Sequence, residues 1–392
     1  MTTRRSLAAF AAAVLLAIGG VGLVYWMRSQ ESAPGVSVAP SPTPAASVAI
    51  TPTTAPTPSL SATAPTPSPS ATTQTDGALQ GADRFAVVVE KGCSPPGPPP
   101  YVRREDRSEV ISALGNGYLC ELRGAVSPDG RRLAYWHFES TGSSEIALYQ
   151  GGASTTLVRL GEELLGNVVW SSDGTGLLFV AMKGGVQGVA PDYAALRTLD
   201  LATGTIQELS RVAGRYVSAL AWDRARRVTA AAETPASGGV GAYLVITEAR
   251  VITRNEMPAN VVLMSASPDA AFVLALAQKD FAIRYWPLTS FDDQRMLLAA
   301  PGFGAGIAAW RPGTREIAVV VSGGTTQSLE LWSIDGSRRR LTDFTSQSGG
   351  LFFRPDGSAL FFGGAAGVDI ATGRVVQFQL AQGERLAASL LR

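Results

Sequence analysis

Short apolar runs alternate with Pro-, Asp- and Gly-containing turns through most of the chain. The segment "VSPDGRRLAYW" starts at Val126, "WSSDGTGLLFV" starts at Trp170, and "FRPDGSALFF" starts at Phe353. In each segment one apolar run ends, a turn follows, and a second apolar run begins. Pro fixes φ in such a turn, and Asp and Gly tolerate the positive φ that tight hairpins require. The pattern predicts a β-hairpin that is repeated along the chain.

The hairpins recur at a nearly constant spacing. Aligned on the residue that precedes each turn, six copies are marked by Val126, Trp170, Trp222, Ala266, Trp310 and Phe353. The intervals between these positions are 44, 52, 44, 44 and 43 residues. A period of about 40 to 45 residues, with four short strands in each unit, is typical of the blades of a β-propeller.

Each repeat contains four predicted strands of different polarity. The first two are almost continuously apolar, as in "LGNVVW" and "GLLFVAM", and the fourth is more polar, as in "TIQELS". Buried inner strands and a solvent-facing outer strand have this composition. We therefore expect an all-β, six-bladed propeller of four-stranded antiparallel blades. A seventh blade is the alternative, because "RFAVVVE" (Arg84–Glu90) and "ERLAASLLR" (Glu384–Arg392) lie outside the six copies.

Two sets of residues at equivalent repeat positions have predicted structural roles. The aromatic markers are expected to pack between neighbouring blades: Trp170, Trp222, Trp310 and Phe353. The Asp-Gly pairs are expected to form the turns between the first two strands of their blades: Asp129, Gly130, Asp173, Gly174, Asp356 and Gly357.

The repeats resemble those of TolB-type β-propellers, which are relatives of the Trp-Asp repeat propellers. The resemblance rests on "VSPDGRRLAYW", "FRPDGSALFF" and "DGSRRRLTD", and it covers about Leu119 to Leu380. The third copy departs from it, because "WDRARR" lacks both Pro and Gly. TolB has a separate α/β domain before its propeller, whereas only Asp76 to Tyr118 precedes the repeats here. The resemblance implies a fold and does not imply an activity.

The first part of the chain has the pattern of a membrane anchor. No charged residue occurs between Arg5 and Arg28, and about 20 apolar residues are enough to cross a bilayer as a helix. Arg4 and Arg5 favour a cytoplasmic N-terminus, with Tyr25 and Trp26 in the opposite interface. We expect a bacterial single-pass membrane protein whose C-terminal domain is extracytoplasmic. The alternative is a cleaved signal peptide that yields a secreted or periplasmic protein, although the apolar run exceeds the usual 7 to 15 residues.

A Pro-, Thr- and Ser-rich stretch follows the apolar run. Residues 32–75 contain no charged and no aromatic side chain, so they cannot bury a core. Their prolines favour an extended spacer, with glycosylation left open. The predicted organisation is a cytoplasmic tail (1–6), a transmembrane signal-anchor helix (7–27), a disordered linker (28–83) and the TolB-like β-propeller (84–392).

Cys93 and Cys120 are the only cysteines. Outside the cell, two cysteines 27 residues apart are expected to form a disulfide bond, and two buried free thiols are the alternative.

Residues with the pattern of a catalytic site are scarce. His137 is the only histidine, and by strand alternation it shares a face with Leu133 and Tyr135 as a packed or channel-lining residue. We assign no catalytic, cofactor-binding or metal-binding residues and expect no cofactor. The net charge of +1, with 17% charged residues, does not favour nucleic-acid binding.

The expected function is therefore that of a monomeric, non-catalytic binding module. Its partners would be the membrane, through the N-terminal helix, and an unidentified extracytoplasmic protein, peptide or glycan. The alternative is an extracytoplasmic hydrolase or lyase that uses carboxylates at the propeller channel.

Overall fold

The structure is a computed structural model in which one compact unit, Ser70–Arg392, contains all the residues that can be described. The described residues are 73–75, 79–81, 84–91, 99–107, 109–114, 122–138, 144–184, 190–236, 241–257, 261–277, 282–297, 304–323, 326–344 and 350–392. The predicted tail and anchor helix, with most of the predicted linker, lie outside them. None of the described residues forms a helix that could span a membrane.

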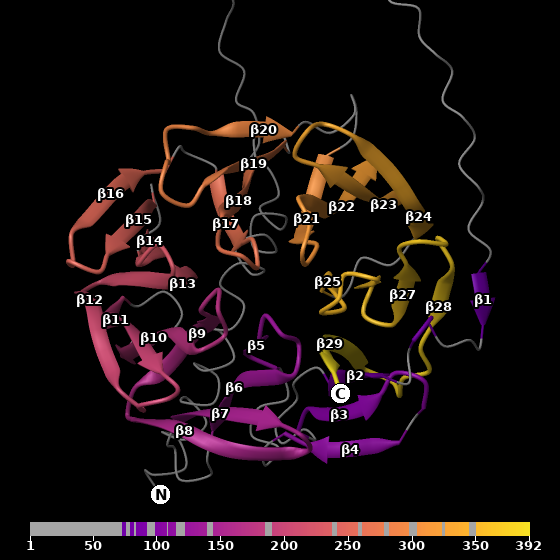
Figure 1. The fold of residues 1–392 in the computed structure, drawn as a ribbon, viewed down its shortest axis with the longest axis horizontal. Coiled ribbons are helices and arrows are strands. Elements are labelled where there is room, and N and C mark those ends of the chain that lie inside the picture. Colours follow the sequence, from indigo (N-terminus) through magenta and orange to yellow (C-terminus); the bar gives the residue numbers. More distant parts are fainter. Residues whose placement is uncertain are drawn as a thin grey trace, which may run out of the picture. The chain divides into compact units, whose positions relative to one another are not determined.

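Seven antiparallel sheets form a ring around a central axis (Figure 1). Blades 1 and 2 are β5 (Gly124–Val126), β6 (Arg132–Phe138), β7 (Ser144–Gln150) and β8 (Ala153–Gly161), then β9 (Leu164–Trp170), β10 (Gly176–Gly184), β11 (Pro191–Asp200) and β12 (Ile206–Val212). Blades 3 and 4 are β13 (Arg215–Asp223), β14 (Val228–Pro235), β15 (Ala242–Thr247) and β16 (Ile252–Glu256), then β17 (Val261–Ala266), β18 (Phe272–Ala277), β19 (Ala282–Pro287) and β20 (Arg295–Leu297). Blades 5 and 6 are β21 (Gly304–Trp310), β22 (Glu316–Gly323), β23 (Thr326–Ser333) and β24 (Arg338–Phe344), then β25 (Phe352–Phe353), β26 (Ala359–Phe362), β27 (Ala366–Asp369) and β28 (Val375–Gln377).

The seventh sheet, the closing blade, joins the two ends of the ring. Its innermost strand is β29 (Glu384–Leu391), and β2 (Phe85–Lys91), β3 (Tyr101–Arg104) and β4 (Val110–Ala113) follow outwards. The prediction of six blades is therefore wrong, and the seven-bladed alternative is confirmed. Counting the turn motif finds only six blades, because β29 and β2 of the seventh blade are paired without a turn that connects them in sequence.

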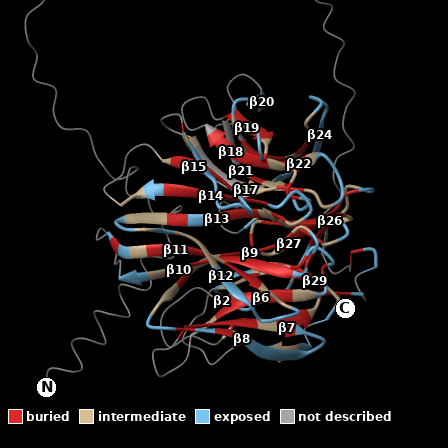
Figure 2. Ribbon diagram, turned by 60° about the vertical axis from the view of Figure 1, so that its left-hand side comes forward, coloured by how far each residue is buried: buried red, intermediate tan, exposed pale blue. Residues whose placement is uncertain are grey.

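The core lies between the blades. The second strands are the most deeply buried, as in β10 and β14 (Figure 2). The outer strand β16, in contrast, is mostly exposed. One hydrophobic cluster, for example, joins Val320 and Leu331 of blade 5 to Leu360 and Val368 of blade 6. The predicted gradient from apolar inner strands to polar outer strands reflects this burial.

Some described residues before Arg84, within the predicted linker, also contact the propeller. Strand β1 (Thr73–Thr75) pairs in parallel with β28 and makes the sheet of blade 6 five-stranded, and Leu79 is buried.

The two sides of the ring carry different connections. Since the strands of a blade alternate in direction, the links from first to second strand and from third to fourth strand lie on one side, which we call the turn side. The remaining links lie on the loop side.

Candidate functional site

The predicted turn residues lie on the turn side and bond within their own turns. Asp173 Oδ1 accepts hydrogen bonds from Ser171 Oγ at 2.7 Å and from the Thr175 amide at 3.0 Å. Asp129 and Asp356 accept the amides of Arg131 and Ser358 in the same way. The glycines that follow these aspartates have φ of +74°, +71° and +70°, in the left-handed region that glycine adopts without strain.

A serine at the start of three turns has a role that the sequence reasoning missed. Ser127, Ser171 and Ser267 each accept, through Oγ, the amide of the residue five positions later, at 2.9 to 3.0 Å. The signal was present, because Ser begins "SPDG", "SSDG" and "SPDA".

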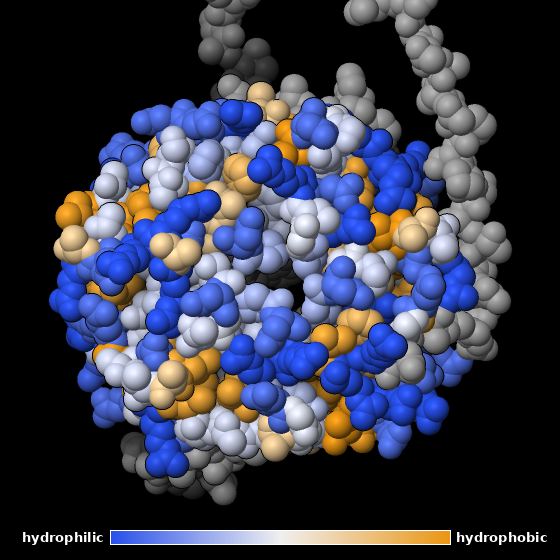
Figure 3. Space-filling model, viewed as in Figure 1, coloured by the Kyte–Doolittle hydropathy of each residue, from blue (hydrophilic) through white to orange (hydrophobic). Residues whose placement is uncertain are grey.

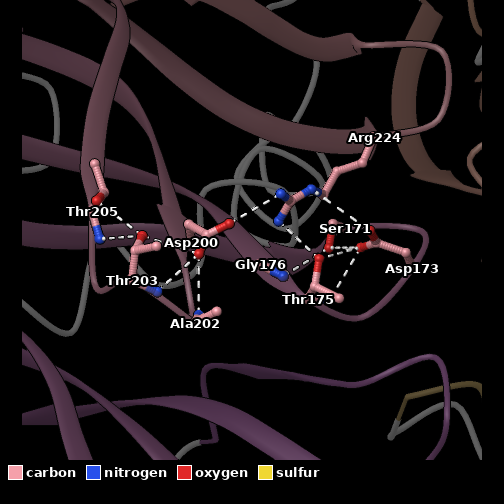
Figure 4. A network of polar contacts seen from close by, with 9 residues as sticks. All are labelled: Ser171, Asp173, Thr175, Gly176, Asp200, Ala202, Thr203, Thr205 and Arg224. Carbon is pink, nitrogen blue, oxygen red and sulfur yellow. Dashed lines mark hydrogen bonds and ion pairs between the residues drawn. The ribbon is translucent and has the colours of Figure 1, made fainter.

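Arg224 connects the turns of blades 2 and 3 (Figure 4). This side chain of blade 3 donates to Thr175 Oγ1 at 2.8 Å and to Asp200 Oδ2 at 3.0 Å, and its Nε lies 3.6 Å from Asp173 Oδ2. Asp200 in turn accepts the amides of Ala202 and Thr203. These contacts form a polar link between blades 2 and 3. Asp173 and Asp200 each accept hydrogen bonds within their own turn and also lie beside Arg224 of the neighbouring blade.

The carboxyl groups of this link are held ionised. Burial alone would raise the pKa of Asp173, but the hydrogen bonds from Ser171 and Thr175 outweigh it and the pKa is lowered. The Thr203 amide and then Arg224 lower the pKa of Asp200. A carboxylate that is stabilised in its charged form suits a structural role better than proton transfer near neutral pH.

Other blades are linked by single bonds on the same side. Arg132 of blade 1 donates to the Gly174 carbonyl of blade 2, and Arg311 of blade 5 donates to the Gly357 carbonyl of blade 6, both at 2.9 Å. Tyr243 and Tyr285 donate to backbone carbonyls of the following blades. Polar groups of the turn side thus hold neighbouring blades together.

The contact between blade 6 and the closing blade contains a buried ion pair. The side chains of Arg354 and Glu105 are each 1% exposed, and Arg354 Nε donates to Glu105 Oε1 at 3.2 Å. Ser389 Oγ donates to the same oxygen at 3.1 Å. Burial raises the pKa of Glu105, and the hydrogen bonds from Arg354 and Ser389 oppose that shift. Arg354 also lies 4.3 Å from the centre of the Phe85 ring.

The aromatic markers lie against the preceding blades. Trp170 of blade 2 donates its indole N–H to the Ala125 carbonyl of blade 1 at 2.7 Å. Trp310 of blade 5 stacks on Phe272 of blade 4 with ring centroids 6.1 Å apart. Trp222 of blade 3 packs over Gly176 of blade 2, where an added Cβ would lie 2.5 Å from the indole, and Phe353 belongs to the cluster between blades 5 and 6.

Polar side chains of the inner strands also link blades. Asn167 of β9 donates to the Ala219 carbonyl of β13 at 2.8 Å and accepts the Ala219 amide at 2.9 Å. Figure 3 shows one face of the ring, with an opening at its centre surrounded by mostly pale, neutral side chains. Hydrophobic side chains form only small, separate patches on that face.

A cluster of charged and aromatic side chains lies on the loop side of blade 2. Glu163, in the link from β8 to β9, accepts Arg197 Nη1 at 2.6 Å, Arg197 Nη2 at 2.8 Å and Tyr193 Oη at 2.7 Å. The Arg211 guanidinium stacks on the Tyr193 ring at 4.1 Å. The Arg211 side chain is 46% exposed, so this stack is accessible to a partner. We define Glu163, Tyr193, Arg197 and Arg211 as the blade 2 cluster.

His137 lies near the loop side of blade 1, beside a buried carboxylate. Its Nδ1 is 3.6 Å from Glu145 Oε2, and its side chain is 23% exposed. Burial would raise the pKa of Glu145, but bonds from Thr156, Arg159 and His137 outweigh it and lower the pKa. The imidazole therefore lies beside an ionised carboxylate.

Among the described residues, no three His, Cys, Asp or Glu side chains come together as a metal site would require. Cys93 and Cys120 lie outside the described residues, so their predicted bond stays a prediction.

No protein-family model matches the chain, and no curated protein matches it. The chain is similar in structure to prolyl oligopeptidase B from Galerina marginata, with 12% identity and a TM-score of 0.51 over 79% of this chain and 52% of that one. An oligogalacturonate lyase in complex with manganese matches with 14% identity and a TM-score of 0.50 over 67% and 79%. TolB from Acinetobacter baumannii matches with 16% identity and a TM-score of 0.46 over 68% and 65%, so the chain spans about two thirds of the length of that protein.

At these identities the similarity shows a shared fold. The class of protein is therefore a seven-bladed β-propeller with four-stranded antiparallel blades. The β-propeller fold that the resemblance of the repeats implies is confirmed by the topology of the seven sheets.

Proposed function

We propose that this chain is a membrane-tethered, extracytoplasmic β-propeller that acts as a non-catalytic binding module for a protein, a peptide or a glycan. The proposal rests mainly on how the turn-side carboxylates are used. Asp129, Asp173, Asp200 and Asp335 have lowered pKa values and accept hydrogen bonds from their own turns. Carboxylates that are hydrogen-bonded within their turns stabilise the scaffold. Catalytic acids and bases, in contrast, usually need a pKa nearer to the working pH.

The loop side is the better candidate for the binding face. Its blade 2 cluster presents an exposed Arg stacked on a Tyr, and Tyr and Arg are the residue types that contribute most to protein interfaces. Arg211 is bonded within its own blade, to Glu208 at 2.8 and 2.9 Å, and keeps an exposed side chain. On the turn side, Arg132, Arg224 and Arg311 are bonded to neighbouring blades.

A capture experiment with two matched variants tests the proposal. The compact unit Ser70–Arg392 is immobilised and exposed to an envelope extract, and Arg211→Glu is compared with Arg131→Glu, which alters an exposed turn-side arginine. We expect a specific partner to be lost by at least tenfold with Arg211→Glu and to be retained with Arg131→Glu. Equal retention by both variants would assign the binding face elsewhere. Failure of the wild-type unit to bind any protein, peptide or glycan would argue against the function.

A second candidate function is that of a hydrolase or lyase. One observation favours it: the His137–Glu145 pair provides a partly exposed imidazole that could act as a general base. Turnover of polysaccharides and lactones, abolished in His137→Asn while folding is retained, would support this alternative. Turnover that is unchanged in His137→Asn would remove this residue from the reaction.

The location of the protein is part of the proposal. An apolar run from Leu7 to Trp26, two arginines before it and a charge-free stretch after it support a signal-anchor and a spacer. Membrane fractionation with N-terminal sequencing distinguishes an intact anchor from a cleaved signal peptide. Light scattering of the soluble unit tests whether it is monomeric.

A further inference from the structure

The segment just before the closing blade is bound to the outer edge of blade 6. Strand β1 pairs in parallel with β28, with Thr73 opposite Val375, Gln74 opposite Val376 and Thr75 opposite Gln377 (Figure 1). Because the order of this sheet is β1-β28-β27-β26-β25, β1 forms its outermost strand. We call Thr73–Thr75, Leu79 and Gln80 together the strap.

A leucine of the strap is buried in the hydrophobic cluster between blade 6 and the closing blade, and we call its place there the pocket. Leu79 is 2% exposed and belongs to a hydrophobic cluster with Phe361 and Val376. The pocket depends on a missing side chain, because a Cβ added at Gly367 would lie 3.1 Å from Leu79 Cδ1. Gly367 therefore leaves the space that a leucine of the strap fills.

A third contact holds the backbone after the leucine. Arg354 Nη1 donates to the Gln80 carbonyl at 2.6 Å, and the same guanidinium is paired with the buried Glu105. Arg354 is 0% exposed, so its orientation is set by the ring rather than by the strap alone.

These three contacts form a recognition site for an extended peptide. A free sheet edge supplies backbone hydrogen bonds, and a side-chain pocket supplies specificity, as in domains that bind peptides by strand addition. Among the described residues, only the outer strand of blade 6 carries an added strand. The outer strand β16 of blade 3 pairs only with β15 and exposes Ile252 by 45%. The added strand thus lies at the one edge that also has the leucine pocket and the buried guanidinium.

We propose that the outer edge of blade 6 is a peptide-binding site that the chain occupies with its own strap. The ligand is an extended segment with a leucine four residues after the pairing strand. A partner's segment of this chemistry binds β28 and the pocket of Gly367, Phe361 and Val376 after it displaces the strap. The strap is therefore an autoinhibitory ligand. This inference rests on the proposed binding function and names one site for it, separate from the loop-side cluster.

The test uses a labelled peptide with the sequence of residues 73–80, TQTDGALQ, and the full chain. The strap is released by Gln74→Pro, which places a residue with a fixed φ and no backbone amide in the pairing strand, together with Leu79→Ser, which removes the apolar side chain from the pocket. We expect the released variant to bind the peptide at least tenfold more tightly than the wild type, because the tethered strap competes in the wild type. A control peptide in which aspartate replaces the leucine should not bind.

Two results would overturn the inference. One is equal affinity of the wild type and the released variant, since the strap would then not cover the site. The other is no binding at about 1 mM peptide by a released variant that still melts cooperatively. If the double variant does not fold, Leu79→Ala alone weakens the attachment of the strap without a proline, and it should bind the peptide more tightly than the wild type by a smaller factor. A negative result in these peptide-binding assays would not change the expected capture of a partner through Arg211. The peptide-binding site and the proposed binding function can therefore be refuted independently.

Discussion

At the scale of single residues, the turns between the inner strands determine which positions tolerate a side chain. Gly130 has φ of +74°, and an added Cβ would lie 2.3 Å from the Cβ of Pro355 in blade 6. Gly313 has φ of +69° with open space around it, and Gly350 has open space without a positive φ. Alanine substitution at these three glycines therefore distinguishes the cost of a positive φ from the cost of a steric clash.

We expect the cost of alanine substitution to fall in the order Gly130, Gly313, Gly350. Gly313→Ala should destabilise the fold by about 1 kcal/mol through backbone strain alone. Gly130→Ala should cost more because Pro355 must also move, and Gly350→Ala should be neutral or slightly stabilising. Denaturant unfolding of the three variants measures the series. Equal costs for Gly313→Ala and Gly350→Ala would contradict the role of the positive φ.

Glu163 of the blade 2 cluster should make stability depend on pH. Burial raises its pKa, but the hydrogen bonds of Arg197 and Tyr193 outweigh burial and bring the pKa below the ordinary value of 4.5. A carboxyl group whose pKa is lowered on folding stabilises the protein above the unfolded pKa, and this contribution is lost as the pH falls through the folded pKa. Glu163→Gln should therefore cost about 2 kcal/mol at pH 7.

The difference between wild type and Glu163→Gln should shrink below about pH 4.5, as thermal or denaturant unfolding at several pH values can show. Glu162→Gln is the matched control, because Glu162 is 86% exposed and solvent screens its ion pair with Lys183, so this substitution should change stability little. A pH-independent difference for Glu163→Gln would show that the carboxylate charge does not stabilise the cluster.

At the scale of elements, the contact between blade 6 and the closing blade includes an ion pair between residues that are 249 positions apart in the sequence. Its ion pair is buried, so removing one partner leaves a charge without compensation. Arg354→Met should cost about 3 to 5 kcal/mol, and Arg354→Met combined with Glu105→Leu should recover most of that loss. The free energy of unfolding of the single and double variants measures the coupling. A double variant that is no more stable than Arg354→Met would mean that the arginine acts through packing on Phe85 instead.

Local sequence patterns predicted the strands of the blades better than they predicted how the ring of blades closes. Apolar runs and turns gave the strands of blades 1 to 6, including blade 3, whose "WDRARR" turn lacks Pro and Gly but contains Arg227 at φ of 58°. The closing blade was miscounted because its first two strands come from opposite ends of the repeats. In the same way, the local pattern "RPDG" indicates only that Arg354 belongs to a turn. It cannot reveal the ion-pair partner Glu105, which lies 249 positions away in the sequence. The blade 2 cluster was missed for the same reason, because Glu163 and Arg197 are 34 residues apart.

At the scale of the whole molecule, the ring is closed by pairing between β2 and β29, two strands from opposite ends of the propeller sequence. The amide of Arg392 donates to the Arg84 carbonyl, and the amide of Leu391 donates to the Gly130 carbonyl of blade 1. Ring closure therefore depends on backbone pairing, on the packing of both neighbouring blades and on the Arg354–Glu105 pair.

The predicted Cys93–Cys120 bond would strengthen this closure. Glu90, three residues before Cys93, accepts a hydrogen bond from the amide of Leu122, two residues after Cys120. This bond brings the described residues that flank the two cysteines together, at the step from the closing blade to blade 1. In the loop-entropy model, a disulfide that closes such a loop contributes about 3 to 4 kcal/mol. We expect no free thiol in the native soluble unit, and a lower melting temperature after reduction or in the Cys93→Ser, Cys120→Ser double variant. Two titratable thiols in unreduced protein would refute the bond, as would Cα atoms more than about 7 Å apart in an experimental structure.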